Sequence, residues 1–242
     1  MITSKTALKI RKTHRYLGLF LGVQFIFWTV SGLYFSWTDI DDIHGDPFKN
    51  LSITPKTFSN LISPSLLEVA TIHSMELREI SDIPFYWINN TKLYNAYSGE
   101  PKDSITPTEA IDIAKRSMIE GLKVESVDYI SQTNAHHEYR KKMLPAYVIS
   151  FESNNNLKAY VSSADGNFQT VRHRSWRWFD FLWMTHTMDY ESRDDFNNVL
   201  LRAFSLLGLI TVLSGFLLWF TSSPKIRRYY RAKKNKSIKE GL

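Results

Sequence analysis

Histidine is the residue type of this sequence best suited to bind a metal or a metal-containing cofactor, because the chain has no cysteine. Thiolate metal sites, disulfides and covalently attached c-type haem are therefore excluded. An imidazole nitrogen can serve as an axial ligand of b-type haem. Of the seven histidines, three adjoin long apolar stretches: His14, His44 and His186. The other four lie in mixed polar sequence: His73, His136, His137 and His173.

His186 ends a segment that is rich in aromatic residues. If residues 176–186 form a helix, Phe179, Leu182 and Trp183 lie at i−7, i−4 and i−3 to this histidine and share its face. Such a face fits a pocket for a flat apolar cofactor. The alternative interpretation is an aromatic helix that anchors the chain at a membrane surface, with His186 in a hydrogen bond, and the anchoring role holds in either case.

The pairing of the three histidines is restricted by the apolar stretches between them. A b-type haem with two histidine ligands takes one nitrogen on each face. Roughly 30 Å of bilayer would separate His14 from His44 and His186. Three arrangements remain: His44 and His186 share an outer site, His14 pairs with its copy in a dimer at an inner site, or both sites exist. His14 could instead be a titratable group among basic residues that bind lipid headgroups.

Two other polar clusters contain side chains that are possible metal ligands. Acidic residues surround His44 and could hold iron or manganese. We favour the interpretation that they are exposed to solvent where the chain leaves the membrane. No metal ion is therefore predicted. These acids are Asp39, Asp41, Asp42 and Asp46. The run His136-His137-Glu138 lies in a predicted loop, where adjacent histidines point opposite ways, so we expect it at the surface.

Two apolar stretches are long enough to cross a bilayer. The first, residues 16–36, is free of charge and spans roughly 30 Å as a helix. The second, residues 199–222, contains only Arg202 as a charged residue, near one end, where its side chain can snorkel to the interface. No small-residue cleavage site follows the first stretch, so we expect an uncleaved anchor rather than a signal peptide.

The basic residues predict the orientation of these spans. Five precede the first span without an acid among them, and a basic tail with Glu240 as its only acid follows the second. Positive flanks remain in the cytoplasm, so both termini are predicted to be cytoplasmic and the middle of the chain periplasmic, in a bacterial inner membrane. The basic residues are Lys5, Lys9, Arg11, Lys12 and Arg15, and Lys225, Arg227, Arg228, Arg231, Lys233, Lys234, Lys236 and Lys239. No nucleic-acid partner is predicted.

An internal repeat organises the exported segment. The run Ser-Ile-Thr-Pro occurs at residues 52–55 and again at residues 104–107, and each copy is expected to open a helix with Pro at its first position. Glu109 completes a capping box in the second copy. Strands are expected after each helix, at residues 84–88 and 92–97 in the first unit and at residues 124–130, 145–151, 157–162 and 168–171 in the second.

The helix that begins T-P-x-E-A-I-x-I-A, the Tyr-rich hairpin of residues 146–161 and the Asp165-Gly166 turn resemble the PepSY domain. His14-Arg15-Tyr16-Leu17-Gly18, Ser31-Gly32 and residues 214–219 resemble the PepSY-associated transmembrane family. This resemblance implies an α+β membrane protein in which two transmembrane helices flank two tandem helix-plus-antiparallel-sheet units. Some larger members look like ferric-siderophore reductases that carry b-type haem, while PepSY units are also implied to bind and restrain peptidases.

Two functions follow as expectations. The first is a haem-binding redox subunit for ferric-siderophore reduction in iron uptake, and the second is a non-enzymatic binding or regulatory module with a peptidase partner. Gly18 and Gly22 form a G-x-x-x-G pattern that allows close helix contact within the chain or in a homodimer. The predicted segments are a cytoplasmic N-terminus at 1–15, a span at 16–36, a connector at 37–51, PepSY-like units at 52–103 and 104–173, an interfacial helix at 174–190, a span at 199–222 and a cytoplasmic tail at 223–242.

Overall fold

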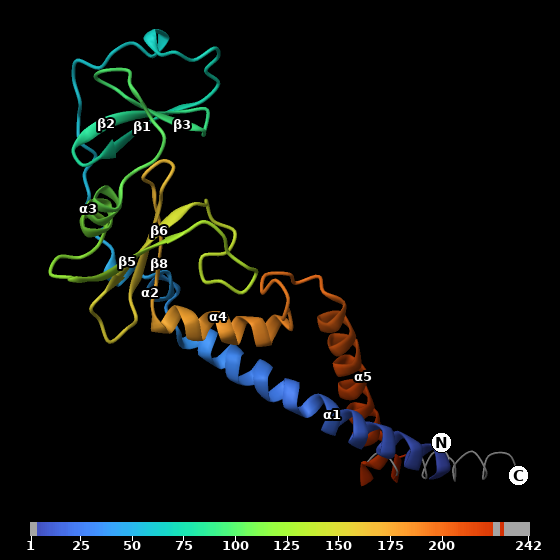
Figure 1. Cartoon of the computed structure of the whole chain (residues 1–242). Helices are drawn as coiled ribbons and strands as arrows, with labels where there is room; N and C mark the ends of the chain where they lie inside the picture. The colour runs from blue at the N-terminus through green and yellow to red at the C-terminus, as the bar shows by residue number, and fades with distance from the viewer. Residues whose placement is uncertain (1–3, 225–227, 230–242) are drawn as a thin grey trace, which may run out of the picture. The chain divides into compact units, whose positions relative to one another are not determined.

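The computed structural model describes residues 4–224, 228 and 229, so most of the predicted basic tail lies outside the described residues. The chain divides into two compact units. The helical unit consists of Met1–Tyr34 and Leu182–Leu242, and the sheet unit consists of Phe35–Phe181. Helices α1 (Ser4–Trp37) and α4 (Arg174–Thr187) each begin in one unit and end in the other, whereas α5 (Val199–Ser222) belongs to the helical unit (Figure 1).

The helical unit contains two helices that are long and apolar enough to cross a membrane, Leu8–Trp37 and Val199–Ser222. Only 17% and 11% of their most apolar windows are buried within the structure. A core helix of a soluble protein would bury most of that surface, whereas spans present it to lipid. Both predicted spans are confirmed as helices, and α1 also includes the basic segment that precedes its span.

One face of α1 forms a seam at alternating spacings of three and four residues. The seam contains His14, Leu17, Leu21, Gln24, Trp28 and Ser31, all of them buried or half-buried. This spacing keeps one stripe of a helix against its neighbours. Gly18 and Gly22 lie off the seam, with no atom within 4 Å of a Cβ built at either position. Within the described part of the chain they therefore make no close helix contact, and their role in a homodimer stays a prediction.

The sheet unit contains two four-stranded antiparallel sheets, each with its strands in chain order. The first sheet consists of β1 (Met75–Ile80), β2 (Ile83–Ile88), β3 (Lys92–Asn95) and β4 (Pro101–Lys102). The second consists of β5 (Val124–Ile130), β6 (Ala146–Phe151), β7 (Lys158–Ser162) and β8 (Phe168–Arg172). Asn89 and Asn90 both adopt positive φ in the three-residue β2–β3 turn, residues 89–91, a conformation that asparagine tolerates. The predicted strands of both units are confirmed.

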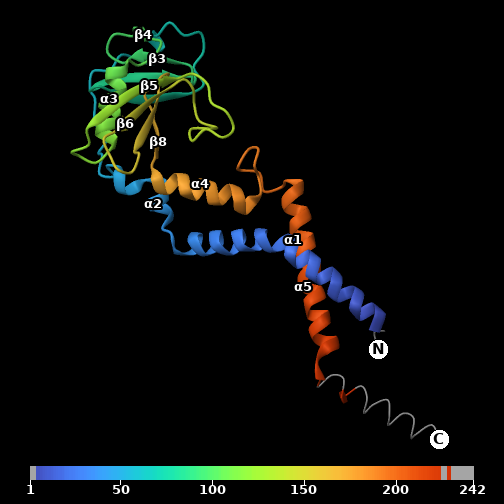
Figure 2. The same ribbon diagram turned by 60° about the horizontal axis from the view of Figure 1, so that its bottom comes forward.

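Helix α3 (Pro107–Ser117) covers the second sheet (Figures 1 and 2). Thr106 and Glu109 form the predicted capping box at its start. Ala110 and Ala114 are fully buried in one apolar cluster that also contains Phe85 of the first sheet and Ile149 of the second. The two sheets and the helix thus share a core, which confirms the predicted α+β fold class.

The helix expected after the first Ser-Ile-Thr-Pro run does not form. Between residues 51 and 74 the only helical element is the short 3-10 turn Pro64–Leu66. The third helical position of this copy is Thr57 rather than a glutamate, so no capping box is possible. Lys56 would also place a positive charge at the positive end of the helix dipole. The segment instead follows the first sheet, where Tyr86 donates a hydrogen bond to the Ile62 carbonyl at 2.9 Å.

Candidate functional site: two serine-bound histidines

His14 contacts one face of α5. Its Nδ1 lies 2.7 Å from the hydroxyl of Ser214 and 3.2 Å from the backbone carbonyl of Thr211. A carbonyl oxygen can only accept, so the contact with Thr211 is a hydrogen bond in the tautomer with the hydrogen on Nδ1 of His14. The Ser214 hydroxyl donates to that same carbonyl at 2.7 Å, which leaves its oxygen free to accept from the imidazole. In the neutral ring Nε2 therefore carries the lone pair.

Gly215 leaves room for the His14 ring. A Cβ at this position would lie 3.2 Å from Cε1 and 3.8 Å from Nε2 of the imidazole. Contacts as short as the first force a neighbour to shift. Thr211, Ser214 and Gly215 are spaced i, i+3 and i+4, so they share one face of the helix. The Ser-Gly pair of α5 therefore supplies both a hydrogen-bond partner and space for His14.

His186 makes the corresponding contact with the Ser-Gly pair of α1. Its Nδ1 lies 2.6 Å from the hydroxyl of Ser31, a fully buried residue. That hydroxyl donates to the carbonyl of Phe27 at 2.6 Å, one turn earlier in α1. When the serine proton is used in this way, its oxygen accepts from Nδ1–H of His186, which is the tautomer that leaves the lone pair on Nε2. Burial lowers the pKa of His186, which favours the neutral form of the ring.

Side chains of the helical unit hold the last turn of α4, which carries His186. The final carbonyls of a helix have no partner within it. Gln24 Nε2 donates to the carbonyl of Thr185 at 2.9 Å, and Trp28 Nε1 donates to that of His186 at 2.7 Å. The carbonyl of Thr187 accepts from Asn198 Nδ2 at 2.9 Å. Neighbouring side chains thus fix the backbone of the histidine as well as its ring.

The two histidine–serine pairs lie at different levels of α1. His14 and Ser31 are separated by 17 positions in one helix, which corresponds to about 26 Å at 1.5 Å per residue. His14 and His186 therefore cannot bind one iron within a single chain, in agreement with the sequence argument. The sequence did not reveal the serines as partners, because Ser-Gly pairs in a span are equally typical of plain helix packing.

The other predicted site residues have different surroundings. His44 is exposed at the end of α2 (Ile40–His44) in the sheet unit, so its pairing with His186 of the helical unit stays a prediction. Asp39 caps α2 by accepting from the Asp41 amide at 3.0 Å, and Asp46 pairs with Lys49 at 2.7 Å. Within the described part of the chain, no group of three or more His, Cys, Asp or Glu side chains is placed to hold a metal ion.

The expectation that His136-His137-Glu138 lies at the surface is wrong for Glu138. This carboxylate accepts from Arg177 Nε at 2.6 Å and Nη2 at 3.1 Å, and from the Tyr160 hydroxyl at 2.7 Å. Burial alone would raise the pKa of Glu138, but the hydrogen bonds from Arg177 and Tyr160 outweigh it, and the net pKa is lowered. Arg140 of the same loop pairs with Asp180 of α4 at 2.6 Å. Glu138 and Arg140 of the inserted loop therefore each form an ion pair with α4.

Comparison with known protein families supports a membrane protein of this architecture. A family described as the PepSY-associated TM region matches residues 11–240, which include both spans and the whole sheet unit. No curated protein and no solved structure gives a significant match. The match and the two apolar helices together show a membrane protein whose long helices contact lipid.

Proposed function

This chain belongs to the PepSY-associated TM region family, and we propose that it is a haem-binding redox subunit that passes electrons to ferric iron or a ferric siderophore. The observation that carries the proposal is the pair of histidines at two levels of α1, each with Nδ1 hydrogen-bonded to a serine. Nε2 of each ring has the lone pair that a metal ligand requires.

The donor set fits b-type haem in a specific way. Histidine ligands of metals commonly donate their other ring N–H to a fixed acceptor, which orients the ring and makes the ligating nitrogen more basic. Ser214 and Ser31 are such acceptors for His14 and His186. Bound at these nitrogens, haem would supply reversible one-electron transfer. The protein would fix the direction of the rings through these serines.

A haem bound at His14 (the inner level) or at His186 (the outer level) needs a second axial nitrogen. For the inner level we propose His14 of a second copy, in a homodimer that forms through the open surface at Gly18 and Gly22. For the outer level we propose His44, which is exposed on α2. The basic residues before α1 support an inner-membrane orientation with cytoplasmic termini and a periplasmic sheet unit. In that orientation His14 is close to the donor side and His186 close to the acceptor side.

An absorption spectrum of the protein in mild detergent, recorded before and after dithionite, tests this proposal. We expect a Soret band, together with α/β bands that sharpen when dithionite is added. Both His14→Ala and His186→Ala should weaken these bands. His73→Ala is the matched control, because only the backbone amide of this exposed residue makes a hydrogen bond. A folded preparation without a Soret band after expression with added haem precursor would refute the proposal.

A second candidate is a membrane-anchored module that binds a peptide segment of a partner such as a peptidase. It is favoured by β1, an edge strand on which Met75 and Leu77 are each 46% exposed. Extended peptides can add to such edges. Met75→Lys with Leu77→Lys would then release a co-purifying partner. Retention of that partner by the double variant would contradict this alternative.

A further inference from the structure

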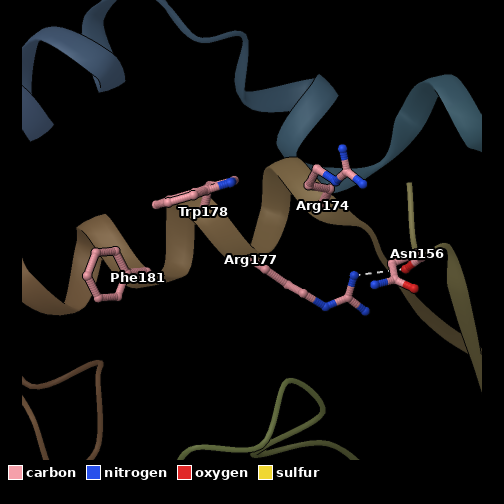
Figure 3. Close-up of a pocket in the computed structure, with 5 residues that line it drawn as sticks. All are labelled: Asn156, Arg174, Arg177, Trp178 and Phe181. Atoms are coloured by element: carbon pink, nitrogen blue, oxygen red, sulfur yellow. Dashed lines mark hydrogen bonds between the residues drawn. The ribbon is translucent and has the colours of Figure 1, made fainter. Parts of the chain in front are cut away.

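The first turns of α4 carry a cavity that neither histidine level uses. It has a volume of about 420 Å³ and is lined by Arg174, Arg177, Trp178 and Phe181 together with Asn156 (Figure 3). The four helical residues follow the spacing i, i+3, i+4 and i+7, so they form one face of α4. Trp178 is 59% exposed and Phe181 43% exposed. Exposed aromatic side chains beside two cations indicate a surface that contacts a ligand or lipid.

The two arginines of this face differ in the charge they can offer. Arg177 is paired with Glu138 and also donates to the Asn156 carbonyl at 2.8 Å. Arg174 donates only to a backbone carbonyl, that of Asn154 at 2.8 Å, and pairs with no carboxylate among the described residues. Arg174 therefore keeps a net positive charge and most of its guanidinium N–H groups available. A planar guanidinium suits bidentate binding of a phosphate.

Polar and apolar groups follow one another along the helix in a definite order. Arg174 comes first, Trp178 follows one turn later, and Phe181 follows almost one turn after that, in a T-shaped contact with Trp178 at 6.1 Å. Figure 3 shows the nitrogen end of the Trp178 ring on the side of Arg174, with Phe181 further along the helix. In the last turn of the same helix, the carbonyls of Thr185 and His186 are bound by side chains of the α1 span. Along α4, the aromatic end of the face is thus nearer to this last turn, and Arg174 lies further from it.

We propose that this face of α4 binds one phospholipid, with its phosphodiester on Arg174 and the Trp178 N–H, and the start of its acyl chains on Trp178 and Phe181. A phospholipid has the same order of groups: one negative phosphate followed by apolar chains that point into the bilayer. Tryptophan is enriched where headgroups meet chains, for the same reason. One uncompensated arginine matches the single charge of a phosphodiester.

The test uses the full chain in mild detergent, with short-chain phosphatidylglycerol as the probe and native mass spectrometry to count bound lipid. We expect one lipid to bind each wild-type chain, with Arg174→Gln weakening its affinity about tenfold, since a charge-assisted hydrogen bond is lost. Trp178→Ala should weaken it as well. Arg202→Gln is the matched control, because Arg202 is an exposed arginine at the start of α5 and should leave binding unchanged.

Two outcomes would overturn the proposal. If Arg174→Gln and Trp178→Ala both bind the lipid with wild-type affinity, this face is not its site. If glycerol phosphate displaces the lipid at equal concentration, the acyl contacts with Trp178 and Phe181 contribute nothing and the occupant is a small anion. Brominated acyl chains add an independent readout, because they should quench Trp178. The quenched fraction should therefore fall in Trp178→Phe.

Discussion

The central chemical feature at the scale of single residues is the state of two imidazoles. In both cases the serine hydroxyl is already committed to a backbone carbonyl of its own helix, at 2.6 Å for Ser31 and 2.7 Å for Ser214. With the hydroxyl proton on that carbonyl, the serine oxygen accepts from Nδ1–H of the histidine. This arrangement selects the tautomer that can bind iron through Nε2.

Ser31→Ala tests whether that selection matters. It removes the acceptor of His186 Nδ1–H, so the ring can rotate or adopt the other tautomer. We expect haem affinity to fall about ten- to a hundredfold, as for other partners of metal-binding histidines, and the midpoint potential to shift. Ser31→Thr keeps the hydroxyl and should restore much of the affinity. If haem titrations gave the same affinity for wild type and Ser31→Ala, the serine would contribute only packing and not the orientation of His186.

Glu138 predicts a pH dependence of stability. Its pKa in the folded chain is lowered below the ordinary 4.5, so its contribution is present above pH 4.5 and is lost as the pH falls through the folded pKa. Glu138→Gln should cost about 1–2 kcal/mol at pH 7, allowing for partial solvent screening. The difference from wild type should shrink below pH 4.5.

Thermal unfolding of the full chain in detergent between pH 7 and pH 3.5 measures that difference. Glu120→Gln replaces an exposed carboxylate of the same unit and should give a curve parallel to wild type throughout. A gap between wild type and Glu138→Gln that stays constant down to pH 3.5 would mean that the Arg177 pair does not depend on the charge of Glu138.

At the scale of elements, α4 has a dual attachment. Its earlier turns are held by the inserted loop through Glu138 and Arg140. Its last turn is held through carbonyls that accept from Gln24, Trp28 and Asn198. The last carbonyls of a helix have no partner within it, so side-chain donors from neighbouring elements can fix the position of its end.

Trp28→Phe should loosen the end of α4. The ring volume is largely kept, but the carbonyl of His186 loses its donor, at a cost of about 1 kcal/mol. Hydrogen exchange of the amides at residues 184–188 should accelerate relative to wild type. Thr29→Ala is the control, since Thr29 bonds only within its own helix at 2.8 Å. If hydrogen exchange in Trp28→Phe were unchanged, the hydrogen bonds from Gln24 and Asn198 would be enough to hold the last turn of α4.

The elements also show which features could be predicted from sequence. Spans, hairpin strands and α3 were predictable because uncharged length, alternation and the Thr106–Glu109 capping box are local signals. The helix predicted after the first Ser-Ile-Thr-Pro run was wrong, because this run begins a helix only when the residues after it favour one. The partners of His14, His186 and Glu138 were not predictable, since each contact joins residues far apart in the chain, such as His14 and Ser214.

At the scale of the whole molecule, the account depends on orientation across the membrane. The chain has no cysteine, so single-cysteine variants report topology without background. Thr6→Cys, before the first span, should react with a membrane-impermeant maleimide only after the membrane is broken. Ser98→Cys, on an exposed turn of the sheet unit, should react in intact spheroplasts. The reverse labelling pattern would place His14 on the outer side of the membrane. His14 would then be close to the electron acceptor and His186 close to the electron donor.

The most direct measurement is the haem content per chain of wild type, His14→Ala, His186→Ala and the double variant, all purified in the same detergent. The account predicts that each single variant loses part of the haem and that the double variant loses all of it, while secondary structure stays intact. A double variant with the wild-type haem content would contradict it, and so would four preparations that contain no haem.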